Sequence, residues 1–300
     1  DDGRPTVGLL YSLRNYPYYS FGIVSQIMDR LAANWNVVPL GIYPGEKKFA
    51  LIEKHLAEGL KLDVVWDFLP FRFGAGPMGG NEEAGLSVFR QLGVPVMHPI
   101  FMNKRKIDDW QELLTGFGPA ELIIGIMLPE LDGVVDTIPI AGLQPVPSQT
   151  IPDLSELTLI SDRFDKLEEK SHHYALLRKK KNKDKKVAFI LYNYPPGEAS
   201  VGGGAFLDTF QSVENICRFL GQNGYAVGDV TAKQLEATFM DGGCCNTAQW
   251  SRYSTDMLHV DGNTLLPKPH EALKQRFLER SIAEWGDPTG PTLADGEQYF

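Results

Sequence analysis

The apolar run TVGLLY at residues 6–11 decides how the first part of the chain folds. When this run is extended, apolar side chains point to both faces, which is typical of a strand buried on both sides. Similar runs recur at residues 37–43, 62–68 and 94–100, and segments with helical spacing separate them. Strands that alternate with helices over short links predict a mostly parallel sheet covered on both faces.

The helices between these strands are predicted from apolar residues three and four positions apart. They are expected at residues 21–33, 47–60 and 81–92. Asn81 is well placed to cap the third helix. Two prolines in the strand at residues 94–100 suggest that it lies near an edge of the sheet or ends quickly. With a further strand at residues 137–142, residues 1–150 are predicted to form a doubly wound α/β domain.

A linker and a charged helix are expected to follow over residues 151–185. A Pro-rich link ends near residue 152, and a strongly charged helix is predicted at residues 155–181. The basic run at residues 178–186 suits a helix C-terminus, which favours cations, followed by a solvated link.

A second α/β unit is predicted over residues 186–300, with the boundary near residue 183. It opens with the apolar run VAFILY at residues 187–192, expected to be a buried strand. A Gly-rich loop and a helix at residues 208–223 come next, and Gly224 is placed to end that helix. The chain starts without Met and stops on a segment that resembles the start of a strand. We therefore expect a fragment whose second unit continues in the parent protein.

The composition excludes several classes of protein. The net charge of −9 argues against general nucleic-acid binding, which needs a basic surface. The longest apolar stretches are far shorter than the roughly 20 residues that a membrane helix requires. Three cysteines, an odd number, do not make a disulfide framework, so a reducing compartment, the cytoplasm, is expected.

The loop from Tyr194 to Gly204 is the first candidate for ligand contact. Gly202, Gly203 and Gly204 lie between the strand predicted at residues 187–192 and the next helix, where backbone N–H groups can hold an anion. No phosphate-loop or dinucleotide-binding spacing is present, and a plain tight turn explains the glycines equally well. A second Gly-rich loop at residues 73–80 has the same placement. The two loops either face a common cleft or are plain tight turns, and the cleft is not preferred over the turns.

Glu130 and Asp132 form the second candidate, in the turn LPELDG at residues 128–133. Paired carboxylates accept protons or hold metal ions. Asp-Gly turns are also common for backbone reasons, and this structural alternative is preferred. No catalytic residue is assigned. Cys244 and Cys245 have histidines within reach in sequence but match no zinc spacing, so no metal site is assigned either.

Several segments together resemble the large subunits of cobaltochelatase and magnesium chelatase, in the same order and with similar spacing. They are residues 74–80 (GAGPMGG), 92–96 (LGVPV), 128–133 (LPELDG), 186–196 (KVAFILYNYPP), 202–207 (GGGAFL) and 282–290 (IAEWGDPTG). Thr289 stands where the family tends to have a second proline. These residues do not separate the cobalt branch from the magnesium branch.

In that family the large subunit binds the tetrapyrrole, a hydrogenobyrinic acid diamide or protoporphyrin IX, and houses insertion of Co²⁺ or Mg²⁺. An AAA+ ATPase subunit, which uses ATP and Mg²⁺, and a third subunit supply conformational work. The resemblance implies this role for the parent protein and no cofactor in the fragment itself. The family's His- and Glu-containing segment is expected beyond residue 300. The fragment is therefore expected to scaffold the tetrapyrrole enclosure and to be inactive alone.

Two alternatives stay open from the sequence. The first is a two-lobed small-ligand-binding protein with a hinge near residues 145–185. The second is a pure interaction scaffold that never contacts the pigment.

Overall fold

The structure of the chain is a computed structural model. It describes residues 3–13, 21–43, 45, 47–69, 71–76, 79–113, 116–148, 150, 153–192, 202–204, 206–241, 279, 293–294 and 297–298. Two compact units are present, Asp1–Lys180 and Lys181–Phe300, and each is described by itself.

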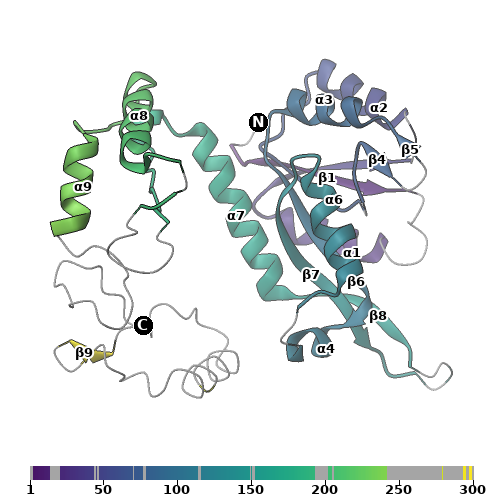
Figure 1. Ribbon diagram of the computed structural model, residues 1–300. Coiled ribbons are helices and arrows are strands. Elements are labelled where there is room, and N and C mark those ends of the chain that lie inside the picture. The colour runs from purple at the N-terminus through teal and green to yellow at the C-terminus, as the bar shows by residue number, and fades with distance from the viewer. Residues whose placement is uncertain are drawn as a thin grey trace. The chain divides into compact units, whose positions relative to one another are not determined.

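The first unit is built on a six-stranded sheet with the strand order β2-β1-β3-β6-β7-β8 (Figure 1). Its strands are β1 (Thr6–Ser12), β2 (Asn36–Ile42), β3 (Val64–Asp67), β6 (Val96–Lys106), β7 (Val135–Pro145) and β8 (Ser155–Leu159). Neighbouring strands run parallel, except that β8 runs antiparallel to β7. This mostly parallel sheet confirms the predicted fold class.

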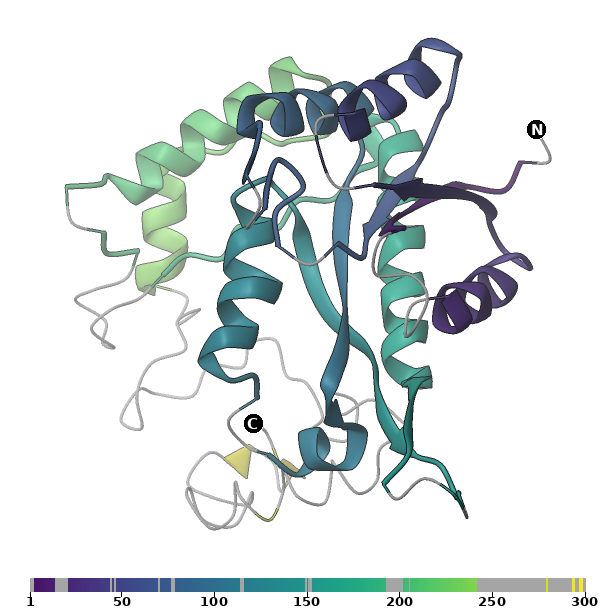
Figure 2. The same cartoon turned by 90° about the vertical axis from the view of Figure 1, so that its right-hand side faces the viewer.

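Helices cover both faces of this sheet (Figures 1 and 2). They are α1 (Phe21–Leu31), α2 (Lys47–Ala57), α3 (Glu82–Leu92), α4 (Ile107–Glu112), α5 (Pro119–Leu122), the π-helical turn η2 (Ile123–Met127), α6 (Leu128–Glu130) and α7 (Ser161–Lys179). Apolar residues of α1 and α7 pack into one core, and those of α2 and α3 into a second core on the opposite face. The sheet is therefore doubly wound, as predicted.

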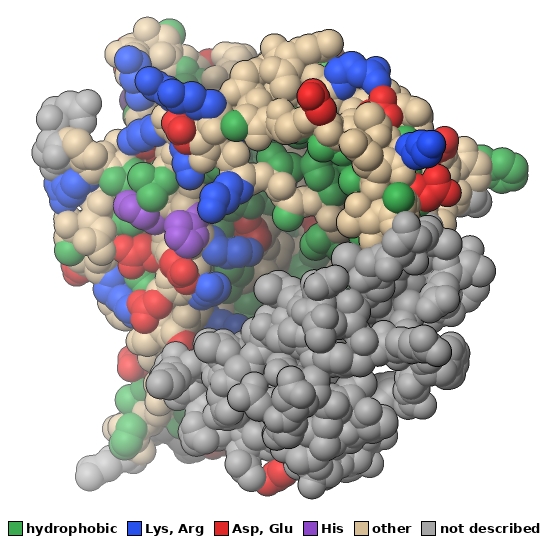
Figure 3. Space-filling view, turned by 90° about the vertical axis from the view of Figure 1, so that its left-hand side faces the viewer, with side chains coloured by type: hydrophobic (Ala, Val, Ile, Leu, Met, Phe, Trp, Pro, Cys, Tyr) green, Lys and Arg blue, Asp and Glu red, His purple; other side chains and the backbone are tan. Residues whose placement is uncertain are grey.

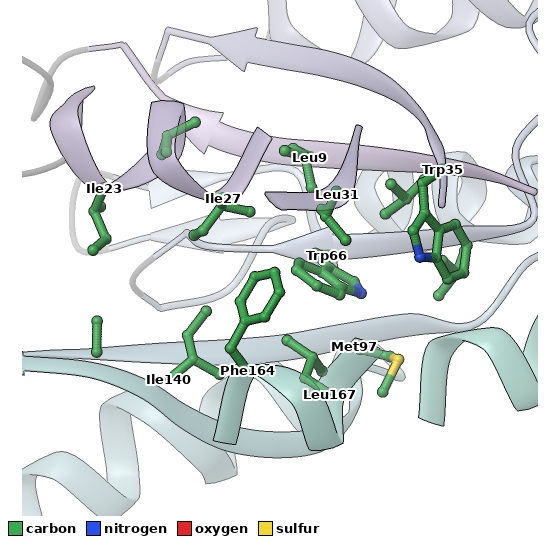
Figure 4. Packing of buried hydrophobic residues seen from close by; sticks show 14 of the residues in the cluster. Leu9, Ile23, Ile27, Leu31, Trp35, Trp66, Met97, Ile140, Phe164 and Leu167 are labelled. Atoms are coloured by element: carbon green, nitrogen blue, oxygen red, sulfur yellow. The ribbon is translucent and has the colours of Figure 1, made fainter. Parts of the chain in front are cut away.

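Trp66 of β3 is fully buried in the first core, between side chains of α1 and α7 (Figure 4). Its ring meets that of Phe164 edge-on, with 5.7 Å between the ring centroids. Its indole Nε1 donates to Oγ of Ser171 at 2.8 Å, so the one polar atom of the ring is paired. Helix α7 is thereby fixed against the sheet by both packing and a hydrogen bond.

Strand β6 corrects the prediction that residues 94–100 lie near an edge or end quickly. It is 11 residues long and lies between β3 and β7. Its pairing with β7 shifts register between Met97 and Pro99. Because proline has no N–H to donate, such an irregularity lets an interior strand accept it.

Residues 155–159 correct a second prediction, because they form the strand β8 instead of the start of the charged helix. Leu157 and Leu159 pack against the first core, while Glu156 is exposed. This alternation with a period of two is typical of a half-buried strand. The helix α7 begins only at Ser161.

The predicted cap of helix α3 is confirmed. The side chain of Asn81 accepts a hydrogen bond from the backbone N–H of Ala84 at 2.9 Å and so caps α3.

The strand β2 lies at the end of the strand order and carries the exposed Pro39. Its parallel pairing with β1 continues through Pro39, which lies opposite Leu9.

The second unit contains η3 (Asn182–Asp184), α8 (Thr209–Gln222), α9 (Ala232–Asp241) and the short strands β9 (Leu293–Ala294) and β10 (Glu297–Gln298). The rings of Phe210 and Phe239 lie 5.9 Å apart and join α8 to α9. Gly224 has φ +81° directly after α8, as predicted for its terminating glycine.

The apolar run at residues 187–192 corrects the prediction of a buried strand. It has no strand assignment, and Ile190 is 96% exposed. Val187 and Phe189 are also exposed. The longer described elements of this unit are helices, so this run finds no sheet among the described residues in which to be buried.

Charged side chains of both signs are interspersed on the face shown in Figure 3. On α7, for example, Lys166 pairs with Glu169 at 2.8 Å. None of the helices within the described part of the chain is long and apolar enough to cross a membrane.

Candidate functional site

The strand order reverses between β1 and β3, which places a crevice at their carboxyl ends. From β1 the chain moves outward to β2, and from β3 it moves the other way to β6 and β7. In open α/β sheets, ligands bind outside the carboxyl ends of the strands at such a reversal. The candidate site is therefore the edge at which β3 ends, at Asp67.

Asp67 is a buried carboxyl group at this edge, only 1% exposed. Its Oδ1 accepts a hydrogen bond from the backbone N–H of Leu69 at 2.8 Å. Its Oδ2 has no partner among the residues that the structure describes. Burial raises the pKa of Asp67 to about 8, so the group carries a proton at neutral pH. The unpartnered oxygen is then available as a donor.

His98 lies beside Asp67 on the neighbouring strand β6. Trp66 pairs with Met97, so the next residues, Asp67 and His98, are neighbours on the opposite face, that of α2 and α3. The ring is 4% exposed and forms a hydrogen bond with the backbone carbonyl of Asp67. Burial lowers the pKa of His98 to about 4, so the imidazole is neutral at pH 7. Its Nδ1 has no partner within the described part of the chain.

Lys48 in the first turn of α2 supplies positive charge to the same edge. Its Nζ lies 5.0 Å from the ring centroid of Phe49 and 5.1 Å from that of Phe73. Partial burial lowers its pKa, whereas attraction to Asp132 and Asp67 acts in the opposite direction. Lys48 forms no salt bridge with any residue that the structure describes.

Asp132 connects the turn at residues 128–133, in which it lies, to the Gly-rich loop at residues 73–80. Arg72 donates to its Oδ1 from Nε at 2.9 Å and from Nη2 at 2.6 Å. The backbone N–H of Gly74 donates to its Oδ2 at 3.1 Å. Arg72 also contacts Glu82 at 2.8 Å, and both carboxylates raise the pKa of the guanidinium. The turn at residues 128–133 thus holds the start of the loop at residues 73–80.

Gly74 and Gly85 allow the backbone of the loop that begins at residue 73 to lie directly against helix α3. A Cβ atom on Gly85 would lie 2.5 Å from Cα of Gly74, a separation that real Cβ atoms essentially never show. The backbones therefore touch only because neither residue has a side chain. Together with Asp132, this contact fixes the loop beside the carboxyl end of β3.

The predicted site residues fall in different places. Asp132 is buried in the network with Arg72, whereas Glu130 is exposed at the last residue of α6. Gly202 is buried with φ +65°, and its carbonyl accepts a hydrogen bond from the hydroxyl of Thr209. Gly203 and Gly204 are exposed before α8. Tyr194, like the cysteine pair at residues 244–245, lies outside the described residues.

The structure joins Asp132 to the loop at residues 72–74, but Gly202, Gly203 and Gly204 belong to the second unit. Ligand contact by these glycines and by Glu130 therefore stays a prediction, as does the common cleft.

Sequence reasoning missed Asp67, His98 and Lys48. Asp67 was available as the polar residue that ends a buried apolar run, at the carboxyl end of a strand in a predicted parallel sheet. His98 interrupts the apolar run VPVMHPI in the same manner. Nothing in the sequence indicated Lys48, because its position follows only from the packing of α2.

The fold and this edge define an α/β unit of the kind that binds small molecules at its strand ends. A family model described as CobN/Magnesium Chelatase matches residues 1–300, and the chain belongs to this family. The resemblance derived from the sequence motifs is thereby confirmed.

Individual relatives agree with the family. The chain is 30% identical to the aerobic cobaltochelatase subunit CobN of Pseudomonas aeruginosa, over 98% of the chain and 23% of that protein. It is 23% identical to the chloroplastic magnesium-chelatase subunit ChlH of Oryza sativa subsp. indica, over 100% of the chain and 21% of that protein. It is 27% identical to the uncharacterized protein MJ1441 of Methanocaldococcus jannaschii, over 98% of the chain and 25% of that protein. The chain thus spans about a quarter or less of the length of these relatives.

One solved structure has the same fold. The catalytic subunit of cobaltochelatase from Mycobacterium tuberculosis superposes with a TM-score of 0.66, over 96% of this chain and 23% of that one. Only 19% of the residues are identical, so this likeness concerns the fold alone.

Proposed function

We propose that the chain is part of the large subunit of a metal chelatase, which inserts Co²⁺ or Mg²⁺ into a tetrapyrrole of cobalamin or chlorophyll biosynthesis. The observation that carries this proposal is the match to the CobN/Magnesium Chelatase family along the entire chain. Relatives named as cobaltochelatase and magnesium-chelatase subunits support both choices of metal.

Within the parent protein, the role of this chain is to scaffold the tetrapyrrole enclosure. The loop at residues 72–74 is suited to such a role, because Asp132 and Gly85 fix its position beside the strand ends. Metal insertion itself requires a base for the pyrrole N–H protons and groups that deliver the metal. We assign that step to the parent protein, and the isolated chain is expected to be inactive.

The proposed partners are an AAA+ ATPase subunit and a third chelatase subunit. ATP and its Mg²⁺ are bound by the ATPase partner, and the inserted Co²⁺ or Mg²⁺ is a substrate. Glu130, Gly202, Gly203 and Gly204 are retained as positions that contact the tetrapyrrole or these partners. The exposure of Gly203 and Gly204 before α8 supports this choice, and Gly202 has φ +65° beside them.

Titration with a porphyrin and with a corrinoid tests the proposal. Deuteroporphyrin IX and a hydrogenobyrinic acid diamide are added to the chain, and the visible absorption band is followed. A shifted, saturable band is expected for at least one pigment. A chain that changes neither spectrum would instead be an interaction scaffold.

A second measurement addresses catalysis. The chain and the full-length subunit are each mixed with the two partner subunits, ATP, the pigment and either Co²⁺ or Mg²⁺. Metal insertion is expected only with the full-length subunit. Insertion by the isolated chain would contradict the assignment of chemistry to the rest of the parent protein.

A further inference from the structure

Two neighbouring buried side chains, at the level of the sheet where β3 ends, each carry a polar atom without a partner among the described residues. The atoms are Oδ2 of Asp67 and Nδ1 of His98, on residues that are 1% and 4% exposed. The large majority of buried side-chain polar atoms in native proteins have a hydrogen-bond partner, from protein or from ordered water. Two unpartnered atoms side by side therefore point to a polar group from water or from a ligand at this place.

Two cations lie near this edge, and they differ in how they are paired. Arg72 forms salt bridges with both Asp132 and Glu82. Lys48 has no salt bridge within the described part of the chain, although the charge of Asp132 attracts it. It also lies in the first turn of the 11-residue helix α2, where the helix dipole adds positive potential.

We infer that Lys48 and Asp67 form a binding site for a carboxylate group of a small molecule at the carboxyl ends of β1 and β3. One carboxylate oxygen pairs with the ammonium group of Lys48, and the other accepts a hydrogen bond from the carboxyl proton of Asp67. Nδ1 of His98 accepts a hydrogen bond from a water molecule. This arrangement satisfies each atom of these three side chains that the described protein leaves without a partner.

A carboxylate fits better than a phosphate group. One unpaired cation balances one negative charge, and the two donors match the two oxygens of a carboxylate. The ligand is either a tetrapyrrole through an acidic side chain or a free carboxylic acid. Binding of a tetrapyrrole rests on the proposed function, whereas the carboxylate site itself does not.

The binding test uses deuteroporphyrin IX, its dimethyl ester, succinate and inorganic phosphate as probes for the chain. Lys48→Met removes the charge and keeps the apolar stem, and Lys47→Met is the matched control at the neighbouring exposed position. A charge-assisted hydrogen bond contributes about 1.5–3 kcal/mol, which corresponds to a loss of about 10-fold or more in affinity. We expect that loss for the acid probe in Lys48→Met and wild-type affinity in Lys47→Met.

Each outcome of this test has a definite meaning. If the porphyrin acid binds at least about 10-fold more tightly than its ester, and only Lys48→Met weakens it, a tetrapyrrole is the source. If only succinate binds, with the same dependence on Lys48, the carboxylate site stands and the tetrapyrrole role of this chain fails. Equal binding of acid and ester, tighter binding of phosphate than of succinate, no probe binding, or equal loss in both lysine variants overturns the inference.

The pH dependence of probe binding provides a second measurement. It would not differ between the wild type and Asp67→Asn if Asp67 had only a structural role. Above about pH 8, Asp67 ionises and repels a carboxylate. Asp67→Asn keeps a donor at the same place at every pH, so it is expected to bind the acid probe at pH 7 and to weaken less than the wild type at pH 9. The other titratable groups near Asp67 are Lys48 on α2, Asp132 after α6 and the neutral His98 on β6, all unchanged in this variant. Identical pH profiles for wild type and Asp67→Asn would remove Asp67 from the site.

Discussion

Arg72 donates from both Nε and Nη2 to the same carboxylate oxygen of Asp132, although 60 residues separate the two along the chain. The second oxygen of Asp132 is occupied by the backbone N–H of Gly74. The carboxylate side chain is inaccessible to solvent, and the guanidinium side chain is 10% exposed. Asp132 is thus committed to holding the loop, and this role does not require a ligand.

Asp132→Ala is expected to lower the free energy of unfolding by about 3 kcal/mol, because it removes a fully buried carboxylate that accepts hydrogen bonds from Arg72 and from the backbone N–H of Gly74. Urea unfolding followed by tryptophan fluorescence measures the change. Glu82→Ala is the control, since Glu82 contacts the same guanidinium but is 59% exposed, and it should lower the free energy of unfolding by much less than Asp132→Ala does. Equal losses in the two variants would argue against a dominant role for the buried pair.

Gly85→Ala is expected to destabilise the first unit by about 2 kcal/mol, because the new methyl group collides with the backbone of Gly74. The loop at residues 72–76 must then move, which amide hydrogen exchange detects as faster exchange. Gly22→Ala, in a helix position with nothing within 4 Å of the new Cβ, is the control. It should leave stability unchanged or raise it by up to about 1 kcal/mol.

The stability of the first unit is expected to depend on pH through Asp67 and His98. The pKa of Asp67 is raised from 3.8 to about 8, so the unfolded chain loses this proton first and stability falls as pH rises through that range. The pKa of His98 is lowered from 6.5 to about 4, so stability falls as pH drops from 6.5 to 4. The two slopes oppose each other below pH 6.5, and only the slope of Asp67 remains above it.

Wild-type protein should therefore lose about 1.4 kcal/mol per pH unit from Asp67 between about pH 6.5 and 8. Asp67→Asn should remove this loss and reveal the opposite slope of His98 between pH 4 and 6.5. Urea unfolding at a series of pH values measures both slopes. A variant profile that still falls above pH 6.5 as steeply as the wild type would show that another group titrates there.

Ile190→Ala is expected to change the stability of the second unit by less than about 0.5 kcal/mol, because the side chain is 96% exposed. Val213→Ala, at a position that is 7% exposed in α8, should cost about 2 kcal/mol from the loss of two buried methyl groups. Thermal unfolding followed by circular dichroism compares the two. A large loss in Ile190→Ala would show that the apolar run at residues 187–192 is buried after all.

The sequence was sufficient for features that depend on local pattern. Four predicted apolar runs in the first part of the chain became β1, β2, β3 and β6, and the cap by Asn81 follows from its place before α3. The strand β8 was missed, because its five residues adjoin a long charged helix and were absorbed into it. The run at residues 187–192 was predicted as a strand from composition alone, yet a strand also needs a neighbour to pair with.

The candidate site could be predicted only in part. A carboxylate at position 132 was recognised, but its partner Arg72 lies 60 residues away, and no spacing rule connects the two. Asp67 and His98 become neighbours only through the register of β3 and β6. Their altered pKa values follow from burial, which depends on the packing of α2 and α3 and not on the residues beside them in sequence.

Pro39 on the outermost strand β2 has a consequence for how copies of this protein behave at high concentration. The pairing of β2 with β1 is continuous through Pro39, so the missing N–H falls on the open side of the strand. A strand from another molecule that docks there meets an interrupted row of donors and a protruding ring. The edge therefore resists the intermolecular β-sheet growth that leads to aggregates.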